Sequence, residues 1–415
     1  MLVFGVAGCG NSFTPGQSGP EVIDGNRNET TPSPLGKTQG EPNGSFDDAL
    51  IALFDDTATA RLQGTIPESS SGTEDVDVFQ LGAMHPGDRI IVDAATPNSP
   101  LDINIALFDD MERLVSVNDD RDWDAGDIDS YIDVVARHAG ELYYLVVSAS
   151  AFAGDGHDSG SYSIDIEVES GMPVPAPAGQ TLLLDFTGGE LYLPRVGTIL
   201  LDPFDAADIA PRYADQTKAM KKWIQATVEQ NFERFDVTVC STDDPMPEEE
   251  FSTLFFGGFS EDNNLGFASG VDEYNADHCD DAVIYTENFD PVLFFFPPTT
   301  REMATAIGNV ASHEAGHILG LNHVDDERAL MDTESAATAL LTDQEFRQAP
   351  LNHQIAPIGV QDAALLLTES LGLTGEGNAA RRVLPSAHER FRLRGAQEAP
   401  RKGEVSRIRP LYGGN

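Results

Sequence analysis

The chain has few basic residues and no long apolar run. Lys and Arg number 25 against 69 Asp and Glu, so the formal net charge over 415 residues is −44 at pH 7. Such a charge repels phosphate backbones and anionic headgroups, and we expect neither a nucleic-acid partner nor attachment to a membrane by charge. No segment in the body of the chain approaches the roughly 20 apolar residues that span a bilayer.

Cysteine is also scarce, with three residues in all. Cys9 ends the short apolar segment 1–9, whose Val-Ala-Gly-Cys ending resembles the lipobox of bacterial lipoproteins, in which this cysteine carries the lipid. The usual preceding basic residues are missing, so another export route and a chance cysteine are the alternatives. Under the lipobox interpretation, the protein is extracellular or in the cell envelope and meets the membrane only through a lipid anchor at Cys9.

The other two cysteines, Cys240 and Cys279, lie in the second half of the chain. In an exported protein they can form a disulfide with each other. Two buried thiols are the alternative, because cysteine also serves as a small apolar residue.

Three histidines and a glutamate form the pattern with the clearest chemistry. On a helix, His313 and His317 are four residues apart and project from one face. Gly320 can take the left-handed conformation that ends a helix, and the turn can then bring His323 to the same point. Three imidazoles leave one position of a tetrahedral Zn²⁺ open for water, which indicates a catalytic site. Glu314 is placed to act as general base and acid on that water.

This pattern is similar to that of a known peptidase family. The run HEAGHILGLNH from His313 to His323, followed by Met331, resembles the metzincin signature HExxHxxGxxH with its downstream methionine turn. The segment Ala329–Asp332 and the Gly-Leu-x-His spacing most resemble the matrixin branch. The resemblance implies a zinc peptidase in which Met331 forms the floor of the metal site. Asp-Thr follows this methionine where matrixins often have Tyr-Pro, a departure that concerns the substrate pocket.

Composition divides the chain into segments. Residues 10–45 are rich in Gly, Pro, Ser, Thr and Asn. After Gly377 the chain has nine basic and three acidic residues. We expect both segments to be disordered, because neither can bury enough apolar surface to offset the entropy lost on folding. We predict a truncated signal-like segment over 1–9, a flexible linker over 10–45, a β-rich domain over 46–170, a Pro-rich linker over 171–179, a catalytic domain over 180–375 and a disordered basic tail over 376–415.

Short runs of β-forming residues separated by turns predict an antiparallel β-sandwich over 46–170. The runs are 78–81, 89–92, 103–108, 142–147 and 162–166. The order Asp75–Phe79, Pro86–Asp88 and Ala139–Tyr143 resembles the bacterial pre-peptidase C-terminal (PPC) domain, an accessory module of secreted peptidases. This resemblance carries over no catalytic residue.

The acidic segment 119–129 alternates carboxylates as a calcium loop does. Its Gly126 stands one place late, however, and Tyr131 occupies the position where an EF-hand needs a bidentate glutamate. A solvated acidic loop and a Ca²⁺ site are therefore both open.

Apolar spacing in the second half predicts an α+β domain. We expect a strand at 182–186, a helix through 220–232, a strand at 235–239, a strand at 281–286, a helix that begins near Arg301, and a closing helix over 359–371. In the metzincins the equivalent of 281–286 lies along the cleft and pairs with extended substrate.

Together these patterns predict an exported, monomeric zinc metalloendopeptidase that hydrolyses protein or peptide substrates. Its fold would be an N-terminal antiparallel β-sandwich followed by an α+β metzincin-like domain. A surface adhesion or binding protein with an inactive zinc domain is one alternative, and the intact Glu314 counts against it. A zinc hydrolase acting on a non-peptide amide is the other, and the family resemblance disfavours it.

Overall fold

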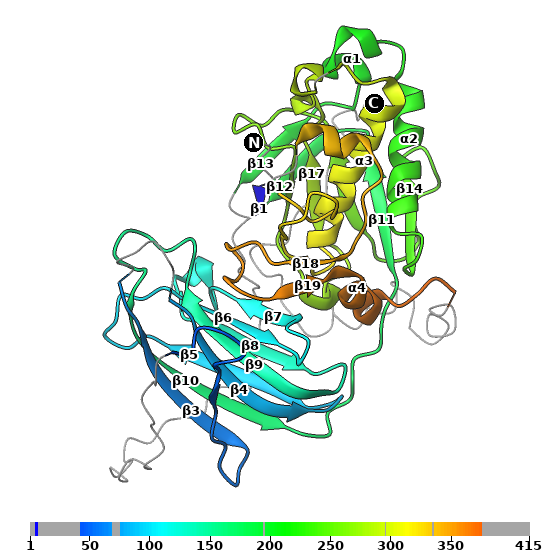
Figure 1. Cartoon of the computed structure of the whole chain (residues 1–415). Coiled ribbons are helices and arrows are strands. Elements are labelled where there is room, and N and C mark those ends of the chain that lie inside the picture. Colours follow the sequence, from blue (N-terminus) through cyan, green and yellow to red (C-terminus); the bar gives the residue numbers. More distant parts are fainter. Residues whose placement is uncertain are drawn as a thin grey trace. The chain divides into compact units, whose positions relative to one another are not determined.

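The computed structural model describes residues 5–6, 42–68, 75–193, 196–294, 296–333 and 336–375. Cys9, nearly all of the predicted linker and the basic tail lie outside this range. The chain divides into two compact units (Figure 1): an N-terminal unit, Gly10–Val174 with Ala356–Ile358, and a C-terminal unit, Pro175–Ile355 with Gly359–Asn415 and Met1–Cys9. No helix in the described part of the chain has the length and apolarity needed to cross a membrane.

In its described residues, the N-terminal unit consists of strands and connecting segments, with one short 3-10 helix at Trp123–Ala125. One sheet has the antiparallel order β3-β10-β5-β8, and the other has the order β2-β4-β9-β6-β7, antiparallel except for the β2–β4 pair. The strands are β2 (Leu50–Ile51), β3 (Thr59–Ile66), β4 (Asp77–Met84), β5 (Arg89–Ala95), β6 (Ile103–Phe108), β7 (Leu114–Asn118), β8 (Tyr131–Val135), β9 (Gly140–Ala149) and β10 (Gly160–Glu169).

The five predicted β-type runs all lie inside strands, namely β4, β5, β6, β9 and β10. Strand β3 alternates buried and exposed residues, as a strand with one face in a core does. All six residues of β6 are buried, and this strand lies between β9 and β7 in its sheet. The prediction of a β-rich, largely antiparallel unit is therefore confirmed.

The C-terminal unit combines helices with a mixed sheet. The sheet has the order β1-β16-β17-β15-β11-β14, in which β14, β11, β15 and β17 are parallel and β16 runs antiparallel to β17. Its strands are β1 (Gly5–Val6), β11 (Gln180–Asp185), β14 (Val237–Ser241), β15 (Ser252–Phe256), β16 (Gly266–Ala268) and β17 (Asp281–Ile284). Two further strand pairs are β12 (Gly189–Leu193) with β13 (Gly197–Leu201) and β18 (Gln348–Pro350) with β19 (Val360–Asp362). The α-helices are α1 (Ala206–Ile209), α2 (Thr217–Asn231), α3 (Thr300–His317) and α4 (Ala363–Leu371).

Helix α3 carries the first part of the motif and packs beside α2 against the sheet (Figure 1). It begins with a capping box, in which the Thr299 side chain accepts from the Glu302 N–H and the Glu302 carboxylate accepts from the Thr299 N–H. Gly308 lets the two helices approach closely, because a Cβ there would lie 2.6 Å from the Thr227 Cβ. The predicted start of this helix near Arg301 is confirmed.

Two predictions about the sheet and the last helix are corrected. The segment predicted as the cleft strand, 281–286, forms β17 over its first four residues, but β15 and β16 pair with both of its edges, so it has no edge for substrate. The predicted helix over 359–371 starts later. Residues 360–362 instead form β19 against β18, and the Asp362 side chain then caps α4 by accepting from the Leu365 N–H.

The predicted disulfide between Cys240 and Cys279 is not formed in the structure. Cys240 lies on β14, and Cys279 stands two residues before β17. Strands β11 and β15 separate β14 from β17, so three strand spacings of about 4.8 Å each lie between the cysteines' strands. A disulfide requires Cα atoms within about 7 Å.

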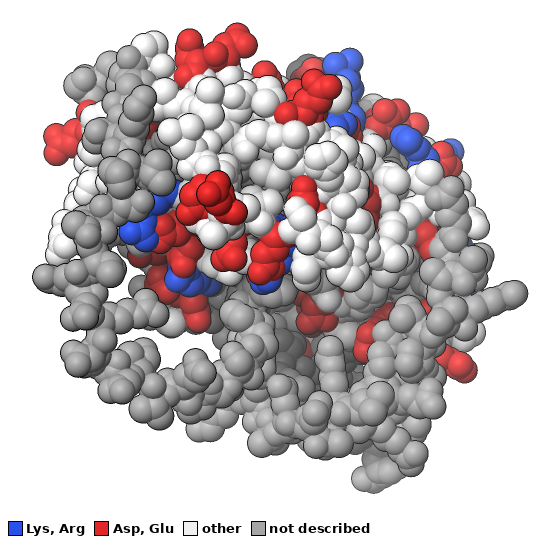
Figure 2. All heavy atoms as spheres, turned by 90° about the horizontal axis from the view of Figure 1, so that it is seen from below, with Lys and Arg blue, Asp and Glu red and all other residues white. Residues whose placement is uncertain are grey.

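On the face drawn in Figure 2, acidic side chains are spread among uncharged ones with few basic side chains between them. The absence of a nucleic-acid partner stays a prediction from this charge.

Candidate metal centre

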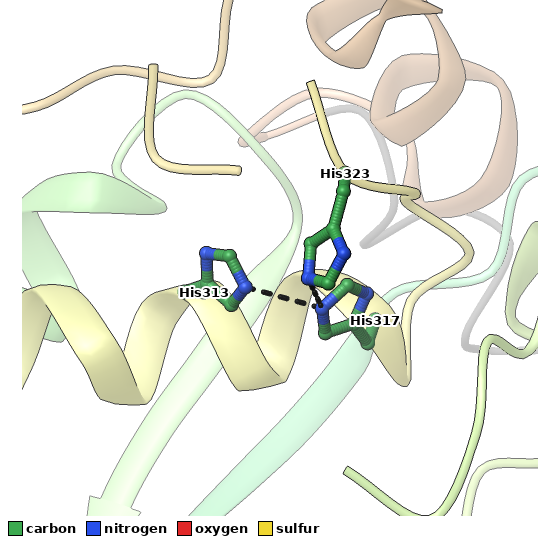
Figure 3. A group of neighbouring side chains, drawn as sticks. All are labelled: His313, His317 and His323. Carbon is green, nitrogen blue, oxygen red and sulfur yellow. Dashed lines mark hydrogen bonds between the residues drawn. The ribbon is translucent and has the colours of Figure 1, made fainter. Parts of the chain in front are cut away.

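The three predicted histidines meet at one buried point (Figure 3). His313 and His317 project from the last turns of α3, each with 1 % of its surface exposed. Their Nε2 atoms lie 3.1 Å apart, and the His317 Nε2 lies 3.0 Å from that of His323. Among the described residues, this is the group of three or more ligating side chains whose atoms lie within 4.8 Å of one another.

Gly320 makes the turn that brings the third histidine back to the helix. Its φ is +96°, which L-residues rarely adopt. A Cβ at this position would also lie 2.8 Å from the Tyr274 nitrogen and 2.9 Å from the Asp272 carbonyl oxygen. Conformation and space therefore both favour glycine here, as the motif predicts.

Backbone carbonyls fix which ring nitrogen of two histidines carries the proton. The Nδ1 of His313 lies 2.6 Å from the Leu330 oxygen, and that of His317 lies 2.7 Å from the Leu321 oxygen. A carbonyl oxygen only accepts, so each Nδ1 must donate, and in the neutral ring each Nε2 then presents a lone pair.

The lone pairs of these rings face one another, an arrangement that is unfavourable unless a cation lies between them. Burial lowers the pKa of all three imidazoles, to about 4 for His317, which keeps the rings neutral. Neutral, converging imidazoles, two of them with the second nitrogen bound to a backbone carbonyl, are the donor set that zinc takes in proteins. The residues present therefore fit a zinc ion.

Glu314 follows His313 in α3 and is fully buried, with 0 % exposure. Neither of its carboxyl oxygens has a hydrogen-bond partner in the described structure. Burial raises its pKa well above the usual value. Because an unsatisfied buried carboxyl destabilises a fold, this one is best explained by a ligand that the site is built to receive.

Two glycines leave space for the side chains of Glu314 and Met331. A Cβ on Gly266, in β16, would lie 2.6 Å from the Glu314 Cγ, so glycine there leaves room for the carboxyl. A Cβ on Gly316 would lie 2.5 Å from the Met331 Sδ, which places this methionine directly beneath the end of α3. Met331 is buried, and its carbonyl accepts from the Val324 N–H at 3.0 Å, next to His323.

The acidic segment 119–129 uses several of its carboxylates in local hydrogen bonds. Asp122 accepts from the Ala125 N–H, and Asp129 accepts from both the N–H and the hydroxyl of Thr96. Asp119 accepts from the Ser150 hydroxyl. These bonds are those of an ordered acidic loop, and a Ca²⁺ site there stays a prediction.

The sequence analysis missed Gly266 and the residues that hold the segment after Gly320. The backbone of Asn322 is bound by Gln361, and the carbonyl of His323 accepts from the Asn352 N–H. Only a glycine inside a short strand could have signalled the first, since such glycines often mark a close approach. The other two show no local pattern.

Comparison with known proteins identifies a family resemblance in the C-terminal unit. A sequence model of the matrixins matches residues 213–344. Archaemetzincin from Methanopyrus kandleri is 13% identical, with 48% of this chain and 98% of that chain covered and a TM-score of 0.25. No curated protein is significantly similar to this chain.

Two solved structures match about a third of the chain each. The pre-peptidase C-terminal domain of a collagenase from Bacillus anthracis is 15% identical, covering 32% of this chain and 100% of that one at a TM-score of 0.19. The lysozyme inhibitor PliG from Aeromonas hydrophila is 14% identical, covering 29% and 96% at a TM-score of 0.23. By their match to the matrixin model, residues 213–344 are a matrixin-like metzincin region, and this region includes all three histidines and Met331.

Proposed function

We propose that this protein is a zinc-dependent metalloendopeptidase. One observation carries the proposal: three buried imidazoles converge through their Nε2 atoms, and the residue after the first of them, Glu314, has a buried carboxyl without a hydrogen-bond partner. The match of residues 213–344 to the matrixins supports a peptidase over other zinc enzymes. The substrates would then be proteins or peptides.

His313, His317 and His323 would hold the metal. When bound there, zinc supplies a Lewis acid that polarises a carbonyl and makes water more acidic. Glu314 accepts a proton from the attacking water, whose oxygen forms a bond to the peptide carbonyl carbon. The C–N bond then breaks, and Glu314 returns the proton to the leaving nitrogen.

The two alternative functions lack a comparable observation. A binding protein gains nothing from a buried, unpaired carboxyl, which lowers stability and would be better replaced by an apolar side chain. A hydrolase of non-peptide amides could use the same residues, so a survey of substrates has to separate it from a peptidase.

We also propose that the N-terminal unit is a β-sandwich of the PPC type and that the protein is exported. The two largely antiparallel sheets and the fully buried β6 support the sandwich. Export, a lipid on Cys9 and a monomeric state rest on the sequence. Globomycin, which blocks removal of lipoprotein signal segments, would test the lipid: an unprocessed precursor supports it, and unchanged processing contradicts it.

The experiment that tests the peptidase is cleavage of an unbiased peptide library by the purified full chain. Wild type is compared with Glu314→Gln and with Glu287→Gln, an exposed glutamate that serves as a matched control. Zinc content is measured for each protein, and a chelator is added to a second set of reactions.

We expect chelator-sensitive cleavage by wild type and by Glu287→Gln, and none by a zinc-loaded Glu314→Gln. Zinc-loaded wild type that cleaves no peptide would favour the binding protein. Equal cleavage by wild type and Glu314→Gln would overturn the role of Glu314.

A further inference from the structure

The third histidine is held differently from the other two. His313 and His317 belong to α3, whose backbone hydrogen bonds fix their spacing. His323 belongs to an irregular segment that begins at Gly320, so helix geometry does not determine its position. Something else must hold the backbone of this segment if its imidazole is to stay 3.0 Å from that of His317.

Gln361 binds both backbone groups of the residue before His323. Its Oε1 accepts from the Asn322 N–H at 2.7 Å, and its Nε2 donates to the Asn322 carbonyl, also at 2.7 Å. The primary amide thus pairs with the peptide groups of Asn322 much as a neighbouring β-strand would. Gln361 is completely buried, so no water can replace these bonds.

The backbone of Gln361 is itself fixed. It lies in the middle of β19, where it pairs with Ala349 of β18. The next residue, Asp362, caps α4. The side chain therefore reaches Asn322 from a rigid base, 39 residues away along the chain.

Neighbouring contacts hold the segment on either side of Asn322. The Leu321 carbonyl accepts from the His317 Nδ1, and the His323 carbonyl accepts from the Asn352 N–H at 3.0 Å. Neither contact binds Asn322. Gln361 instead binds both the N–H and the carbonyl of Asn322.

We propose that Gln361 is a positioning residue that holds His323 in place to complete the zinc site. The inference rests on the proposed function in one respect, namely that the three histidines bind zinc. Gln361 does not touch the metal or the reacting atoms. It acts through the backbone, by restricting the segment that carries the third ligand, so that the site is formed before zinc arrives.

The test is zinc affinity measured by competition with a chelator, using the full chain. Gln361→Met keeps most of the side-chain volume and removes both hydrogen bonds. Gln361→Asn keeps the amide but shortens the side chain by one methylene, so it too should lose both bonds. Gln180→Met is the matched control, because Gln180 is also a fully buried glutamine, and the hydrogen-bond partners of its amide, Thr181, Ser252, His278 and Asn275, lie outside the segment 320–323.

We expect both Gln361 variants to bind zinc about tenfold more weakly than wild type or worse, as is common when residues behind a metal ligand are removed. Gln180→Met should bind zinc like wild type even where its apo form unfolds more easily. In addition, the Co²⁺ spectrum of Gln361→Met should shift toward that of His323→Ala, since both weaken the third ligand.

Three results would overturn the inference. Wild-type zinc affinity in both Gln361 variants would show that the amide does not position His323. An equal loss in Gln180→Met would reduce the effect to general destabilisation. Wild type that binds no zinc would remove the proposed function and this inference together, whereas the first two results leave the proposed function intact.

Discussion

Asp109 in the N-terminal unit and Glu314 in the C-terminal unit are both fully buried carboxyls, yet their surroundings differ. Asp109 accepts hydrogen bonds from the N–H groups of Met111 and Arg113, the Arg113 guanidinium and the His138 ring. Glu314 accepts none in the described structure. Burial alone therefore does not distinguish a structural carboxyl from a functional one. The distinction lies in whether the carboxyl has hydrogen-bond partners.

The presence or absence of hydrogen-bond partners determines the direction in which the pKa of each carboxyl shifts. Burial acts to raise the pKa of Asp109, but the hydrogen bonds from His138 and Arg113 outweigh it and lower the pKa to about 2. Nothing offsets burial at Glu314, and its pKa rises well above the usual value. The first carboxyl adds to the stability of its unit, whereas the second lowers the stability of its unit and is kept available for a ligand.

The largest expected effect comes from replacing Glu314 by leucine. Loss of the general base should lower the rate of peptide cleavage by about 10³-fold. The same substitution removes an unsatisfied buried carboxyl, so the free energy of unfolding of the metal-free C-terminal unit should stay equal or rise. Cleavage assays and urea unfolding measure the two effects. A marked loss of stability would contradict the assignment of Glu314 as an unpaired group.

Asp109→Leu should act in the opposite direction on stability. Removing the carboxylate leaves Arg113 and His138 without their buried partner, and we expect the N-terminal unit to lose about 3 kcal/mol. The two tryptophans of the chain allow the units to be followed separately, because Trp123 lies in one and Trp223 in the other. Fluorescence of Trp123 in a Trp223→Phe background reports this loss. An unchanged transition would mean that these ion pairs do not stabilise the unit.

Zinc should stabilise one unit and not the other. At free zinc one hundred times its Kd, the C-terminal unit should gain about 2.7 kcal/mol, and a chelator should remove this gain. The Trp223 transition should shift, and the Trp123 transition should not. A shift in the Trp123 transition would instead indicate a second metal site, in the N-terminal unit.

Part of the candidate site follows from local sequence. The spacing of His313 and His317 fixes their common face on any helix, and Gly320 marks the turn that ends the helix. These features depend on chain geometry within about ten residues. The five β-type runs of the N-terminal unit were predictable for the same reason, since alternation and turns are local patterns.

The rest depends on contacts between distant parts of the chain. Gly266 makes room for Glu314 from 48 residues away, and Gln361 reaches Asn322 across 39 residues. Gln361 does not stand out in its own neighbourhood, and Gly266 does so only as a glycine in a short strand. Strand order is equally non-local, so the sequence did not show that β15 and β16 pair with both edges of β17 or that Cys240 and Cys279 lie on or just before strands three positions apart.

The pH dependence of the two leucine variants offers a smaller but more specific test of the comparison. Asp109 has a folded pKa of about 2 against an ordinary value of 3.8, so its contribution is present above about pH 4 and is lost as the pH falls toward 2. That contribution is about 2 kcal/mol, since each unit of pKa corresponds to about 1.4 kcal/mol. The stability difference between wild type and Asp109→Leu should shrink by this amount on acidification.

Glu314 should give a profile of the opposite sign. Its folded pKa lies above the ordinary 4.5, so in the metal-free protein the unfolded state loses its proton first, and stability falls as the pH rises above about 4.5. Comparing wild type with Glu314→Leu cancels the titration of the histidines, which both proteins share. The advantage of the leucine variant should grow with pH in chelator and diminish when zinc is bound, because a cation beside the carboxylate favours its charged form. Parallel profiles for the two variants would show that partners do not set the roles of these carboxyls.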